Sequence, residues 1–150
     1  MGARADGWWK DRAGAALRLC REVTVLARRG LPASELPPAA AAWLATEAPE
    51  TGPDGNLRPE WLLVLEGRAR QAADLLSIQD RSSEKALFLG ESDRLVRLVL
   101  ATGSGDDAIV QAVYGLQGRA IVATADRELR GRCAQLGAVA VGPGWLLRLL

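Results

Sequence analysis

Short apolar runs alternate with helical segments in the second half of the chain. The run at 61–65 is continuous, which is typical of a strand buried on both faces. The predicted strands cover residues 61–65, 95–100, 120–123 and 138–141. The predicted helices, each following one of these strands, cover residues 68–76, 108–116, 127–136 and 143–150. Strands that alternate with helices in this order predict an α/β sandwich with a mostly parallel sheet.

The first half contains one long helical pattern. From residue 12 to residue 29 apolar residues recur every three or four positions, which predicts a helix. Asp11 occupies the position of its N-cap, and Gly30 supplies the stop. At 150 residues the chain predicts a single domain, residues 1–150. No apolar run approaches the ~20 residues needed to cross a bilayer, so we expect no membrane partner and, by default, a cytoplasmic location.

Two segments lack a regular pattern. Residues 30–60 hold six of the seven prolines, which predicts a variable connection. Within it we expect a short helix at 39–47 and a loop at 49–59. The polar residues 77–93 predict a second loop, with one turn around 85–89.

The composition excludes several classes of site. The chain has no histidine, which excludes Ser-His-Asp and Cys-His catalysis and histidine-bound zinc. Cys20 and Cys133 are too few for a four-cysteine zinc site, and we expect both in the core. The net charge of +1 gives no strong overall field, so any contact with nucleic acid has to be local. An enzyme with this sequence must therefore use carboxylates, arginines, hydroxyls or a bound cation.

Carboxylates follow three of the predicted strands. Glu66 follows the first, Asp106 and Asp107 follow the turn after the second, and Asp126 follows the third. The carboxyl ends of parallel strands lie at one edge of a sheet, where ligands bind. Clustered carboxylates are the oxygen ligands that Mg²⁺ or Mn²⁺ prefers, and such sites activate water during phosphodiester hydrolysis. We therefore predict a metal site at this edge.

A purely structural role is the alternative for each of these acids. Ser104 and Asp107 have the spacing of a capping box, in which the serine caps the helix and the acid reaches back. Thr124 and Asp126 can cap the next helix in a similar way. Only the shared position of the acids at one sheet edge favours a functional role over these caps.

A dinucleotide-binding loop is a further alternative. Gly103, Gly105 and Ala108 have the spacing of the Rossmann fingerprint, and Asp126 follows about 20 residues later. However, Asp106 and Asp107 place negative charge where the helix N-terminus has to receive an anionic pyrophosphate. The charges therefore count against this alternative.

Four segments resemble the NYN domain family of PIN-like nucleases, which includes the YacP-like ribonucleases. They are VLEGRAR at 64–70, GSGDDAIV at 103–110, VATADRELR at 122–130 and LGAVAVGPGWLL at 136–147. The resemblance implies a Rossmann-like PIN fold, a three-layer sandwich, and cleavage of RNA that depends on Mg²⁺ or Mn²⁺. It implies no small-molecule cofactor beyond the ion.

The resemblance also assigns roles to particular residues. It implies Asp106, Asp107 and Asp126 as catalytic residues and metal ligands, with Glu66 as a further ligand. The candidates for contacts with RNA phosphates are arginines that flank these acids: Arg68, Arg70, Arg127 and Arg130.

One segment of the family pattern is missing. Members of the family begin with a buried strand that ends in a metal-binding aspartate, whereas residues 2–12 resemble only the stretch after that strand. We therefore expect an N-terminally incomplete domain whose true start lies upstream of Met1. The alternative is an inactive remnant that serves as an RNA- or protein-binding module.

Overall fold

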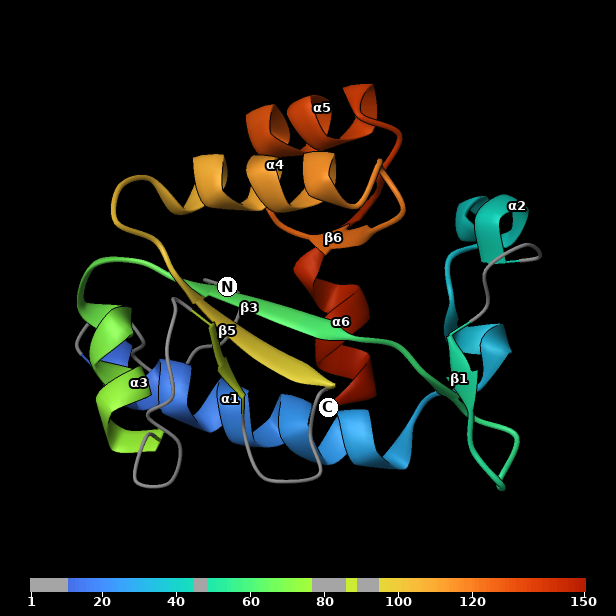
Figure 1. Cartoon of the computed structure of the whole chain (residues 1–150), viewed down its shortest axis with the longest axis horizontal. Coiled ribbons are helices and arrows are strands. Elements are labelled where there is room, and N and C mark those ends of the chain that lie inside the picture. The colour runs from blue at the N-terminus through green and yellow to red at the C-terminus, as the bar shows by residue number, and fades with distance from the viewer. Residues whose placement is uncertain (1–10, 45–48, 77–85, 89–94) are drawn as a thin grey trace.

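The computed structural model describes residues 11–44, 49–76, 86–88 and 95–150. The chain has a mixed α/β architecture with short, mostly parallel strand pairs. In Figure 1, α1 (Arg12–Arg29) runs along one side of the strands, and α4 (Gly105–Gly115) and α5 (Arg127–Gln135) lie on the opposite side. The predicted α/β class is confirmed at this level. The segment 2–12, which prompted the expectation of a missing strand, falls almost entirely outside the described residues.

The remaining elements are short. The strands are β1 (Glu50–Thr51), β2 (Leu57–Arg58), β3 (Trp61–Leu65), β4 (Ala86–Phe88), β5 (Val96–Leu100), β6 (Ile121–Ala123) and β7 (Val139–Val141). The other α-helices are α2 (Ala41–Leu44), α3 (Gln71–Leu76) and α6 (Pro143–Leu149). Three 3₁₀ turns are η1 (Ala33–Glu35), η2 (Pro38–Ala40) and η3 (Gly67–Arg70). No described helix combines the length and the apolar character needed to span a membrane.

The strands form separate small sheets rather than the single sheet expected. β3 pairs in parallel with β5, from Trp61 opposite Val96 to Leu65 opposite Leu100. β4 adds to β5 in antiparallel orientation, and β6 pairs in parallel with β7. Within the described residues, no ladder joins β3 to β6.

The long helix α1 begins and ends as the sequence predicts. The Asp11 side chain accepts a hydrogen bond of 2.8 Å from the Gly14 N–H, as an N-cap does. Gly30 has φ +70° and donates its N–H to the carbonyl of Leu26. A left-handed residue of this kind ends a helix most easily when it is glycine.

Two predictions in the irregular segments are wrong. The turn predicted around 85–89 is instead β4, because Ala86–Phe88 finds backbone partners on β5 that local sequence does not reveal. The loop predicted at 49–59 contains a hairpin of β1 and β2. The short helix predicted at 39–47 is confirmed as α2 in its described part.

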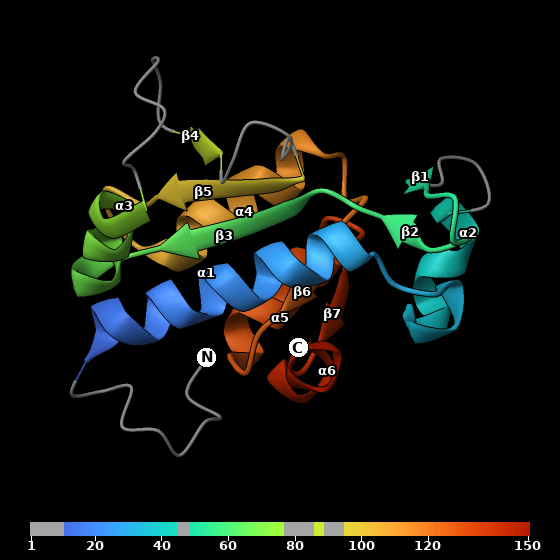
Figure 2. The ribbon, with the colours of Figure 1, turned by 90° about the horizontal axis from the view of Figure 1, so that it is seen from below.

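Apolar side chains join these elements in three clusters. One packs α1 and α3 against β3 and β5, and a second packs α4 and α5 against β6. In the third, Leu26 of α1 clusters with Leu146 and Leu149 of α6, and Trp61 and Ala123 pack against this cluster. Figure 2 shows α1 in front of the strands. Cys20 and Cys133 are both fully buried, which confirms the prediction for the two thiols.

Candidate functional site

Glu66 lies at the end of β3 and contacts the start of α4. Its Oε2 accepts a hydrogen bond of 2.7 Å from the backbone N–H of Gly105. This carboxylate already occupies an N–H at the N-terminus of α4, the kind of group that binds the pyrophosphate of a dinucleotide. The contact therefore adds to the argument against a dinucleotide-binding loop.

Asp106 lies in the first turn of α4 and is partly buried. Burial raises the pKa of its carboxyl group above the ordinary value, and the charges of Asp126 and Glu66 raise it further. The charge of Arg132 acts in the opposite direction on this pKa. Within the described part of the chain, Asp106 has neither a hydrogen bond nor an ion pair for its carboxylate.

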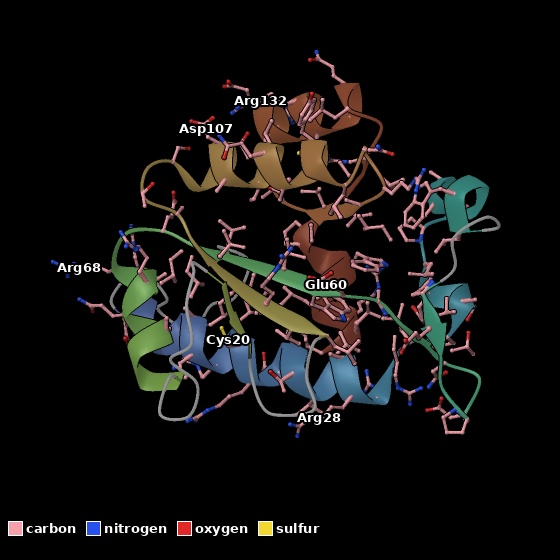
Figure 3. The ribbon with its side chains drawn as sticks, viewed as in Figure 1. Cys20, Arg28, Glu60, Arg68, Asp107 and Arg132 are labelled. Carbon is pink, nitrogen blue, oxygen red and sulfur yellow. The ribbon has the colours of Figure 1, made fainter. Side chains whose placement is uncertain are left out.

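Asp107 points to a different partner. Its Oδ1 accepts a hydrogen bond of 2.6 Å from Arg132 Nη2, and the side chains are 63% and 37% exposed. Figure 3 shows this pair on the outer side of α4 and α5. The capping box predicted for Ser104 and Asp107 is wrong, because the Ser104 side chain makes no cap hydrogen bond.

Asp126 caps α5. Its Oδ1 accepts a hydrogen bond of 2.9 Å from the Leu129 N–H, and its own N–H donates to Thr124 Oγ1. The structural alternative for Asp126 is therefore confirmed. This role does not remove the carboxylate from the candidate site, since its charge raises the pKa of Asp106.

The four acids lie in one region but do not form a closed metal site. Among the described residues, no group of three or more Asp, Glu, Cys or His side chains is close enough together to hold a metal ion. The donor atoms are of the kind that Mg²⁺ or Mn²⁺ prefers, but the described carboxylates alone do not complete a site for the ion. The residues form an acidic edge, in which Glu66, Asp107 and Asp126 each bond to another group of the protein.

The arginines fall into two groups. Arg68 and Arg70 belong to η3, Arg127 and Arg130 belong to α5, and all four are exposed. In Figure 3 the Arg68 side chain extends away from the protein. Sequence patterns gave no indication of Arg132, because its partner Asp107 is 25 residues away and on another helix.

No protein-family model, no curated protein and no solved structure matches the chain.

Proposed function

We propose that the chain is a cation-dependent ribonuclease-like domain of the NYN type, with its reaction site at the acidic edge. The observation that carries the proposal is that acids after β3, β5 and β6 lie in one region: Glu66 bonds to the residue before Asp106, and the charges of Asp126 and Glu66 act, after burial, on the Asp106 carboxyl group. Acids that follow three different strands are near enough for their charges to interact. Carboxyl groups whose pKa is raised by burial and by neighbouring charges are frequent at functional sites.

The pairing of the strands supports the finer fold of this proposal, a PIN-type three-layer sandwich with one further parallel strand. Trp61 of β3 and Ala123 of β6 contact the same apolar cluster, so the two strand pairs are neighbours. Within the described residues, β3 bonds only to β5 and β6 only to β7. A strand between β3 and β6 would join the pairs into one sheet and would end at the acidic edge.

The hydrogen bonds and ion pairs that the acids already make indicate how readily each could bind a ligand. Asp106 makes no side-chain hydrogen bond to any described residue, so none of these has to be broken when it engages a ligand. Asp126 accepts one hydrogen bond and has oxygen lone pairs to spare. Asp107 has to leave Arg132 first, so we assign it a lesser role. The exposed arginines are proposed to contact RNA phosphates: Arg68, Arg70, Arg127 and Arg130.

A non-catalytic RNA-binding module is the second candidate function. The observation that favours it is the lack of a closed metal site among the described carboxylates. A domain of this kind would bind RNA through its arginines and would neither bind Mn²⁺ nor cleave.

Two measurements separate the candidates: Mn²⁺ binding by calorimetry, and cleavage of labelled single-stranded RNA with Mn²⁺ or with a chelator. A ribonuclease binds Mn²⁺ and cleaves only with the ion, and D106N and D126N each abolish cleavage. The control is D54N, the same substitution at an exposed acid of the β1–β2 hairpin, which leaves cleavage unchanged. RNA binding without Mn²⁺ binding or cleavage supports the second candidate and contradicts the first.

A further inference from the structure

The carboxylate of Glu66 joins two elements that are far apart in the sequence. Glu66 directly follows β3, and the N–H that it accepts belongs to Gly105, the first residue of α4. Its side chain makes no cap bond to η3, the turn that begins at the next residue. Ser104, the N-cap residue of α4, makes no side-chain cap bond either. The Gly105 N–H in the first turn of α4 therefore bonds to a side chain at the end of β3, and not to the side chain of the N-cap residue of α4.

The glycine at 105 is explained by this contact. A Cβ at Gly105 would lie 2.9 Å from Glu66 Oε2 and 3.1 Å from its Cδ. The backbone of Gly105 is not in the left-handed region, so close approach rather than conformation favours glycine here. A Cβ at Gly103, in the same loop, would meet nothing within 4 Å. Because a carboxylate at the end of a flexible side chain can move aside, alanine at 105 displaces Glu66 without a clash against backbone.

We propose that Glu66 is a positioning residue, which fixes the start of α4 to the end of β3 and so holds Asp106 at the acidic edge. The proposal rests on the ribonuclease function proposed above, and it replaces the role of metal ligand that the family resemblance implies for Glu66. Asp106 follows Gly105 directly, and a hydrogen bond from a backbone N–H to a carboxylate is a strong restraint on that backbone. Glu66 acts on the site through this bond and not as a ligand of the cation.

Three substitutions separate the bond from the charge. E66Q removes the charge and keeps a side-chain oxygen that accepts from the Gly105 N–H. E66A removes both. G105A keeps the glutamate but pushes it off the N–H, and G103A is its matched control in the same loop.

Hydrogen exchange at the amide of position 105 measures the bond directly. A hydrogen bond to a charged group protects its donor, so exchange at 105 becomes roughly tenfold faster or more in E66A. E66Q, whose neutral amide oxygen makes a weaker bond, exchanges at a rate between those of E66A and the wild type, and G103A exchanges at a rate close to that of the wild type. Unchanged exchange in E66A overturns the proposal, whether or not the protein is a ribonuclease.

The affinity for Mn²⁺ then tests whether the bond between Glu66 and Gly105 supports the cation site. A positioning role predicts that E66A and G105A bind Mn²⁺ several-fold more weakly than the wild type, and that E66Q, which loses the charge but keeps the acceptor, loses less affinity than E66A. A direct ligand role predicts the reverse order, with E66Q as weak as E66A and G105A nearly unchanged, and this result refutes the proposal. If the wild type binds no Mn²⁺, the ribonuclease function and this Mn²⁺-dependent role both fail, and the exchange rates still decide whether Glu66 holds α4.

Discussion

Removal of the Asp126 side chain should destabilise the protein through the loss of one helix cap. Asp126 Oδ1 accepts the Leu129 N–H at 2.9 Å, which satisfies one of the free donors in the first turn of α5. Replacement of a capping aspartate by alanine costs about 1 kcal/mol, within a range of roughly 0.5–2 kcal/mol. Asparagine is as good an N-cap as aspartate, so D126N should keep this contribution.

The expected difference between D126A and D126N is large enough to measure. For a chain of 150 residues, about 1 kcal/mol shifts the unfolding midpoint by roughly 2–4 °C. D126N should unfold at or slightly above the wild-type temperature, because it also removes a charge that raises the pKa of Asp106. Thermal and urea unfolding at neutral pH, followed by circular dichroism, give both values.

The matched control is S104A. Ser104 occupies the N-cap position of α4 but makes no side-chain cap bond, so its substitution should change stability by less than about 0.5 kcal/mol. Equal stability of D126A and D126N would contradict the assignment of the cap. A loss in S104A as large as that in D126A would also contradict it, because the cost would then follow from the N-cap position and not from the bond.

Three further predictions concern other parts of the molecule. Burial, and then the charges of Asp126 and Glu66, raise the pKa of Asp106 above 3.8, so the ionised carboxylate destabilises the fold. D106N should therefore be more stable than the wild type at pH values above the raised pKa. Urea unfolding at several pH values should show that this gain in stability vanishes below about pH 3.8. Gly55 and Gly118 both have φ +77°, but only a Cβ at 118 would overlap a backbone oxygen, that of Leu136. Thermal unfolding should therefore give a cost of about 1–2 kcal/mol for G55A and about 2–5 kcal/mol for G118A. Burial raises the pKa of Cys20 to about 11, so iodoacetamide should label this thiol only as fast as the protein unfolds, and labelling on a faster timescale would show that α1 opens locally.

Local signals in the sequence predicted the regular elements well. The periodicity of α1, its aspartate N-cap and its glycine stop all lie within one continuous segment, and each is confirmed. The strand at 61–65 is confirmed to the residue, because its apolar run and the residues that bound it are adjacent. Such features are set by interactions over a few positions, which a single sequence displays.

Contacts between distant segments account for the errors. β4 forms by pairing with β5, whereas residues 85–89 alone predicted only a turn. α4 begins at Gly105 rather than at residue 108, and the N–H of this first residue bonds to Glu66, which is 39 residues away. The same holds for Asp107, whose partner Arg132 is on another helix. Sequence patterns located the acids of the candidate site but not the groups that bond to them.

The bonds of these acids decide how the candidate site has to be tested. Glu66 holds a backbone N–H of α4, Asp126 holds one of α5, and Asp107 holds the exposed side chain of Arg132. Alanine at the first two positions therefore removes a helix cap together with a carboxylate, and lost activity would not distinguish the two effects. Asparagine or glutamine keeps the hydrogen-bond acceptor and removes only the charge. Asp106 has no such bond within the described residues, so alanine and asparagine at 106 should have equal effects on activity. Unequal effects would show that Asp106 accepts a hydrogen bond in the active state.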